Sequence, residues 1–150
     1  MKFHYLSFLA LPLLVSCASL PKDVAELTQS RLKSDVVCHN EPFTLIVERV
    51  DAFLTRCYSP KKFRGAMYAA GIFVVRTVDV NWEVNESPIE NGTRFVVQTE
   101  WGYALAADVK RGEATCPTVT QYYAAQGPWA RRFSLLDQAT QGDKPACGYE

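Results

Sequence analysis

A stripe of apolar residues between positions 41 and 57 is the strongest pattern along the chain. Its members recur at steps of three and four residues, as on one face of a helix: Phe43, Ile46, Val47, Val50, Phe53, Leu54 and Cys57. Asn40 is a good N-cap, and Pro42 is tolerated in a first turn. Charged residues occupy the opposite side, as a half-exposed helix requires. The pattern predicts a helix over residues 41–56 with one face in the core.

The middle of the chain alternates between apolar and polar residues with a period of two, which is typical of strands with one buried face. The alternation runs through Ile72–Val84 and again from Arg94 to Tyr103. Ala104–Val109 predicts a third strand, and Thr118–Tyr123 predicts a fourth because it is rich in β-branched and aromatic residues. Turn-forming residues predict connections at Ser87–Gly92 and at Lys110–Gly112.

A second helical pattern starts at Pro128, repeats through Trp129, Phe133 and Leu136, and ends before Gly142. A shorter helix after Asp23 is predicted from fewer apolar positions. Alternating strands leave one face to cover, and amphipathic helices have an apolar stripe to bury. The sequence therefore predicts an α+β fold: a two-layer sandwich in which two main helices pack on one face of an antiparallel sheet of three to four strands.

The first residues have the layout of a secretory signal peptide. Lys2 and His4 give a weakly basic start, and an apolar run follows from Tyr5 to Val15. A run of this length is too short to cross a bilayer as a helix, which takes about 20 apolar residues.

The run ends in Leu14-Val15-Ser16-Cys17, which resembles the lipobox of bacterial lipoproteins. The resemblance implies that Cys17 becomes residue one after cleavage and carries the lipid, palmitate included. Ala18 follows where an Asp would favour the inner membrane, which implies anchoring in the outer membrane. The predicted division is a signal peptide (1–16), a lipidated tether (17–22) and a single disulfide-bonded domain (23–150). The alternative is an ordinary secreted protein with a cysteine near the cleavage site.

Four cysteines remain when Cys17 carries lipid, and an exported chain predicts that they form two disulfides: Cys38, Cys57, Cys116 and Cys147. A metal site is the alternative, but no CxxC pair is present and His39 is the only histidine after the leader. An unbroken helix over residues 41–56 is about 24 Å long, whereas a disulfide needs Cα atoms within about 7 Å. Cys38 and Cys57 are therefore not expected to pair, which leaves Cys147 or Cys116 for Cys57.

The net charge of the chain does not point to a particular class of partner. Without the leader, which contains only Lys2, 15 of the 16 basic residues remain against 16 acidic ones, so no nucleic-acid partner is expected. A basic loop after Cys57, with Lys61, Lys62 and Arg64, could meet lipid head groups or an acidic partner by Coulomb attraction, or could simply be solvated.

Aromatic residues in the second half of the chain leave two interpretations open. They could line a groove for a glycan or peptide, or fill the core between the sheet and the helices. The residues concerned are Trp82, Trp101, Tyr103, Tyr122 and Tyr123.

The chain has no nucleophile elbow, metal motif or dinucleotide fingerprint, so no catalytic residue, cofactor or metal is expected. The leading interpretation is a non-catalytic binding or assembly module of the cell envelope. It would be held at the outer membrane by lipid, with its domain facing the periplasm and an envelope protein or glycan as its partner. The alternative is a small periplasmic inhibitor or defence protein directed at an enzyme, and a hydrolase is a distant third.

Overall fold

A computed structural model describes residues 19–69 and 72–148 of the 150-residue chain, and for residues 61–69 and 72–78 it describes the backbone alone. The elements in chain order are α1 (Val24–Thr28), β1 (Val37–His39), α2 (Phe43–Tyr58), β2 (Lys61–Ala69), β3 (Ile72–Val80), β4 (Glu83–Ile89), β5 (Gly92–Thr99), β6 (Gly102–Glu113), β7 (Cys116–Ala124), α3 (Gly127–Ala130) and α4 (Phe133–Thr140). This composition confirms the predicted α+β class.

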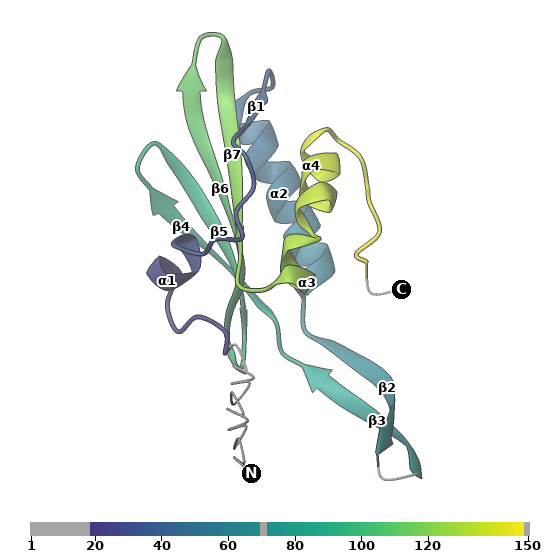
Figure 1. Cartoon of the computed structure of the whole chain (residues 1–150). Helices are drawn as coiled ribbons and strands as arrows, with labels where there is room; N and C mark the ends of the chain where they lie inside the picture. Colours follow the sequence, from purple (N-terminus) through teal and green to yellow (C-terminus); the bar gives the residue numbers. More distant parts are fainter. Residues whose placement is uncertain (1–18, 70–71, 149–150) are drawn as a thin grey trace, which may run out of the picture.

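Five strands form one antiparallel sheet in the order β1-β7-β6-β5-β4. The remaining two strands, β2 and β3, pair with each other and form a separate hairpin that projects from the body of the molecule (Figure 1). The main sheet thus has more strands than the three to four expected. The strand predicted over residues 72–84 divides between β3 of the hairpin and β4 of the main sheet, so the additional strand of the main sheet is β1, a three-residue edge strand.

The sheet buries side chains on both faces, which corrects the predicted layering. On one face, α2 and α4 cover Phe95, Val97, Leu105 and neighbouring residues in the main core. On the other face, Leu27 of α1 packs against a second cluster, whose strand residues are Val96, Ala106 and Tyr123. Consecutive strand residues point to opposite faces. Runs of apolar residues in β5 and β6 therefore need a helix on each side.

The main helix lies close to where its apolar stripe predicts it. It spans Phe43–Tyr58, preceded by Pro42, and buries Ile46, Val50, Phe53 and Leu54. The C-terminal helical pattern instead forms two short helices, α3 and α4, separated at Arg131–Arg132. Gly142 follows α4 with φ +96°, the conformation expected of a residue just past a helix.

Two predicted connections lie within strands. Residues 110–112 extend β6, because Lys110 and Arg111 pair with Val119 and Thr118 of β7. Pro88 lies in β4, where it is tolerated because β4 is an edge strand. Turn-prone residues can continue a strand when a neighbouring strand supplies the hydrogen bonds.

Candidate functional site

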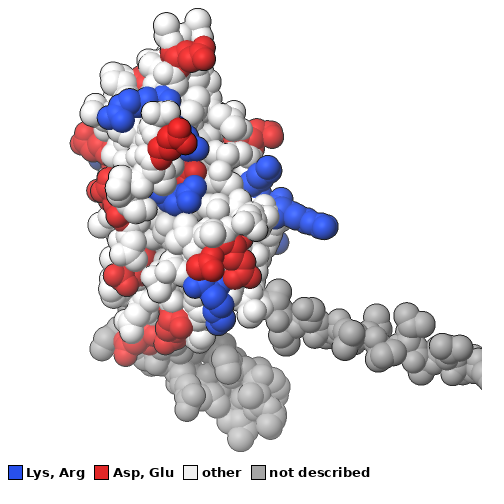
Figure 2. Space-filling model, turned by 90° about the vertical axis from the view of Figure 1, so that its left-hand side faces the viewer, with Lys and Arg blue, Asp and Glu red and all other residues white. Residues whose placement is uncertain are grey.

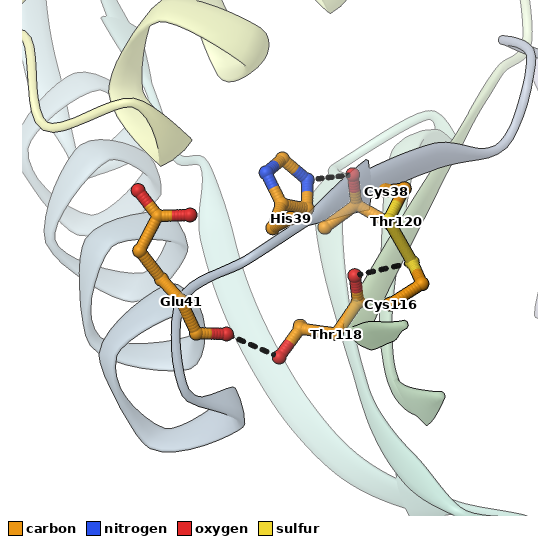
Figure 3. The surroundings of a disulfide bond; sticks show 6 residues. All are labelled: Cys38, His39, Glu41, Cys116, Thr118 and Thr120. Atoms are coloured by element: carbon orange, nitrogen blue, oxygen red, sulfur yellow. Dashed lines mark hydrogen bonds between the residues drawn. A yellow bond between two sulfur atoms is a disulfide. The ribbon is translucent and has the colours of Figure 1, made fainter. Parts of the chain in front are cut away.

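The disulfide between Cys38 and Cys116 fixes an edge of the sheet (Figure 3). It joins β1 to the first residue of β7, with the Cα atoms 5.6 Å apart. Thr118 reinforces the junction by donating a hydrogen bond of 2.8 Å from Oγ1 to the carbonyl oxygen of Glu41. A three-residue strand has little pairing of its own, so the covalent bond holds it in register.

The second disulfide joins Cys57, in the last turn of α2, to Cys147, with the Cα atoms 5.3 Å apart. Arg56 lies beside it and donates a hydrogen bond of 2.6 Å from Nη2 to the carbonyl oxygen of Pro145. The C-terminal segment is thereby held on α2. The two pairs confirm the predicted disulfides, including the exclusion of Cys38–Cys57, and select Cys147 as the partner of Cys57.

His39 lies in β1 between the sheet and the helices, with Nε2 2.8 Å from Oγ1 of Thr120 (Figure 3). Burial lowers the pKa of its imidazole, against the opposing charge of Glu41. A hydroxyl beside an imidazole resembles a nucleophile with its base. However, Thr120 is 1 % exposed and His39 is 6 % exposed. The pair therefore links β1 to β7 in the interior and does not face a substrate in solvent.

An open groove of about 340 Å³ runs between α2 and the C-terminal segment. Its charged lining residues are Arg49, Arg56 and Lys144 together with Asp143, so the lining is positive on balance. The Nη1 group of Arg49 donates a hydrogen bond of 2.5 Å to the carbonyl oxygen of Thr140, and Arg56 is bonded to the same segment. Because both guanidinium groups hold the walls of the groove together, we interpret it as a packing seam.

The aromatic residues do not line one groove. Tyr122 is fully buried and Tyr123 is 9 % exposed. Trp82 packs against Tyr58, with ring centroids 5.5 Å apart. Trp101 is separate from them and 61 % exposed, in the turn between β5 and β6. Of the two interpretations, filling of the core holds for most of these rings, whereas Trp101 faces solvent.

The basic stretch after Cys57 is not a loop, contrary to prediction. Lys61, Lys62 and Arg64 belong to β2, which pairs with β3 from Lys61↔Val80 to Ala69↔Ile72. Its own sequence gives a weak strand signal, because only Phe63 and Tyr68 favour strands, whereas its partner β3 is rich in β-branched residues. Sequence reasoning missed the hairpin because it treated β3 and β4 as one strand. The signal in the sequence was Ala70-Gly71, a turn-prone pair between two uncharged runs.

The hairpin β2–β3 differs from the main sheet in that it consists of two strands only. In the described part of the chain, each of its strands pairs only with the other, so both outer edges are unpaired. In the half farthest from the body, residues 65–69 and 72–75 contain no charged residue. Unpaired, uncharged strand edges readily pair with a strand of another chain. We therefore take the hairpin as the candidate binding site.

Cys17 lies outside the described residues, whereas residues 19–22 of the predicted tether are described and contact the domain. The carbonyl oxygen of Pro21 accepts a hydrogen bond of 3.0 Å from the backbone N–H of Tyr103. Pro21 itself is buried. The N-terminal segment therefore meets the domain at the β5–β6 turn.

Lys, Arg, Asp and Glu side chains are interspersed on the face shown in Figure 2, which has no extended patch of one sign among its described residues. Within residues 19–69 and 72–148, no group of three metal-ligating side chains comes together. No helix in that part of the chain is long and apolar enough to span a membrane.

Comparison of the chain with protein-family models, with curated proteins and with solved structures gave no match.

Proposed function

We propose that this protein is a lipid-anchored, non-catalytic binding module of the bacterial outer membrane, which engages an envelope protein through hairpin β2–β3. The observation that carries the proposal is the hairpin itself, two nine-residue strands that project from the body (Figure 1) and whose outer edges pair with no other described strand. The partner contributes a strand that pairs with one of these edges.

The physical argument is the incomplete hydrogen bonding of an isolated hairpin. Two-stranded hairpins are marginally stable in water, and a third strand adds a ladder of backbone hydrogen bonds. Lipid is a poor occupant of the same edges, because an unpaired strand edge does not occur in the hydrocarbon region of a bilayer. A protein strand can form hydrogen bonds with the unpaired backbone groups of the hairpin. It also suits the uncharged sequence of residues 65–75, because backbone pairing needs no charged side chain.

Lys61, Lys62 and Arg64 lie toward the base of the hairpin, on β2. In this proposal they supply attraction for an acidic patch on the partner, next to the uncharged half that pairs with its strand. The compartment is consistent with the two disulfides, since such bonds persist in oxidising spaces such as the periplasm.

Site-specific photocrosslinking in cells that produce the protein tests the proposal. A photoreactive amino acid is placed at Val74 or Val75, which are consecutive residues of β3 in the uncharged half of the hairpin. The matched control position is Ala114, in the exposed β6–β7 turn. We expect one envelope protein to be crosslinked from the hairpin and not from Ala114. Absence of a hairpin-specific crosslink, or a crosslink only to a second copy of this chain, contradicts the proposal.

Two variants separate the halves of the hairpin. Replacing residues 66–75 by Asn-Gly keeps the pairs from Lys61↔Val80 to Gly65↔Arg76 and removes the uncharged half. We expect the crosslinked partner to be lost from pull-downs with this variant. The triple variant K61Q, K62Q and R64Q is expected to weaken binding in a salt-dependent way. Unchanged binding by the triple variant removes these charges from the proposal and leaves the strand contact.

The alternative function is inhibition of an enzyme, with the hairpin entering its cleft. The observation in its favour is that Cys57, held by its disulfide, lies only four residues before the hairpin begins at Lys61. A fixed base reduces the entropy lost when a projecting element is bound. The identity of the crosslinked protein separates the two functions, because an enzyme that loses activity on binding supports inhibition.

A further inference from the structure

The turn between β5 and β6 presents a large apolar side chain on a rigid support. Trp101 is 61 % exposed. The hydroxyl of Thr99 accepts a hydrogen bond of 3.1 Å from the backbone N–H of Trp101 and donates one of 3.1 Å to the carbonyl oxygen of Gly102. Among the described residues none requires a tryptophan at this position, since most of the surface of Trp101 contacts solvent.

The tether leaves the domain beside this turn. Gly102 has φ +141°, and a Cβ atom there would lie 2.5 Å from the carbonyl oxygen of Pro21 and 2.9 Å from Cβ of Leu20. The tether can approach so closely only because residue 102 has no side chain. In Figure 1 the first described residues lie at the end of the main sheet opposite the β6–β7 turn.

Leu20 is three positions after Cys17, and the chain between them spans at most about 11 Å at full extension. Acyl chains on Cys17 would thus enter the bilayer close to Trp101. Trp side chains are enriched at membrane–water interfaces, where the ring is held at the level of the head groups. We propose that Trp101 lies in the head-group region of the membrane and, together with the lipid, sets the orientation of the domain. This inference rests on the proposed lipid anchor.

The orientation that follows is upright. Strand β6 runs from Gly102 to Glu113, which is about 36 Å at 3.3 Å per residue. The β5–β6 turn would touch the bilayer, and the β6–β7 turn with Ala114 would point away from it. Two attachment points, the lipid and the indole ring, restrict tilting more than a single flexible tether does.

Fluorescence quenching in proteoliposomes tests the proposal. The lipidated protein is reconstituted in vesicles of phosphatidylethanolamine with a minor share of phosphatidylglycerol, some carrying a nitroxide in the head-group region. We expect the nitroxide to quench part of the tryptophan emission, and we expect W101F to lose most of that quenching, because Trp82 and Trp129 pack against the main core. Equal quenching in W101F and the wild-type protein overturns the proposal.

The matched control places tryptophan at the opposite turn. The double variant W101F and A114W has one exposed tryptophan at the far end of β6, and we expect it to remain unquenched. Quenching as strong as that of wild type means that the domain lies flat, which overturns the upright orientation. Shielding of Trp101 from iodide without vesicles means that protein covers the ring, which also overturns the proposal. Mass spectrometry of the same sample tests lipid on Cys17, so a failure of the lipid anchor is distinguished from a failure at Trp101.

Discussion

Asp108 carries a charge into the interior of the sheet, where it is 1 % exposed. It faces Arg94 across the β5–β6 ladder, and the guanidinium group forms two hydrogen bonds with its carboxylate, one of 2.7 Å from Nη2 to Oδ2. Hydrogen bonding to Asp108 raises the pKa of Arg94. A buried carboxylate without its cation is costly, so this pair makes the register of β5 on β6 specific.

Replacing Arg94 by Met tests this pair. We expect R94M to lower the free energy of unfolding by about 3 kcal/mol, because Asp108 is left uncompensated in the interior. Urea unfolding with intact disulfides measures the change. Adding D108N is expected to recover part of the loss. R131M, at an exposed arginine, is the control and is expected to change stability by less than about 0.5 kcal/mol; an equal effect of R94M and R131M contradicts the prediction.

His39 predicts a pH dependence of stability. Burial lowers its pKa in the folded state from the ordinary value of 6.5. Below about pH 6.5 the unfolded chain therefore binds this proton more readily than the folded one, and the free energy of unfolding falls as the pH decreases. Burial raises the pKa of the Asp137 carboxyl group above its ordinary value of 3.8. Protonation of Asp137 therefore has the opposite effect on the free energy of unfolding, and it begins just above pH 3.8.

We expect H39Q, which keeps a side-chain nitrogen in reach of Thr120, to lose less stability than wild type between about pH 7.5 and pH 5.5. Chemical unfolding of both proteins at each pH gives the comparison. Parallel losses in the two proteins would assign the pH dependence to other groups.

At the scale of elements, the two disulfides hold segments that have few backbone hydrogen bonds to the rest of the domain. The disulfides close sequence separations of 78 and 90 residues. One holds the three-residue strand β1, and the other holds the segment after α4. The predicted length of the helix excluded a disulfide between Cys38 and Cys57. The choice of Cys147 as the partner of Cys57 depended on where the chain after β7 lies in the tertiary structure.

Removal of either disulfide is expected to be costly and to act locally. Loops of these lengths predict a loss of about 2 to 5 kcal/mol for each double Cys→Ser variant, because the unfolded chain gains freedom. Loss of Cys38–Cys116 should raise amide exchange in β1, whereas loss of Cys57–Cys147 should raise it in residues 143–148. Hydrogen exchange with mass spectrometry reads both regions. Identical exchange patterns in the two variants would mean that the disulfides act only on global stability.

At the scale of the whole molecule, the two proposed contacts lie toward one end. Figure 1 shows hairpin β2–β3 and the first described residues of the chain at the same end of the main sheet. With the proposed lipid on Cys17 and Trp101 in the head groups, the hairpin would meet its partner near the membrane. A partner embedded in or attached to the membrane fits this arrangement best.

Processing of the leader tests the anchor on which this arrangement rests. Inhibition of the lipoprotein signal peptidase is expected to leave a precursor that still contains residues 1–16 and is heavier by their mass. In this precursor Cys17 is expected to be diacylated. C17S should abolish fatty-acid labelling. A mature protein of unchanged mass and without lipid in untreated cells contradicts the lipobox assignment.

The sequence by itself determined the elements whose signals are local. The apolar stripe of α2 and the alternation of β5 predicted their positions to within a few residues, because each pattern reflects burial of one side of a single segment. The exclusion of Cys38–Cys57 followed in the same way from the length of one helix.

Only the tertiary structure decided how segments far apart in the chain pair. Residues 110–112 look like a turn until β7 supplies their hydrogen bonds, and the basic residues 61–64 look like a loop until β3 lies beside them. The second buried face of the sheet likewise appears only when α1 packs on Val96 and Ala106. Periodicity records which side of a segment is buried. The identity of the neighbouring segment depends on contacts that no local pattern encodes.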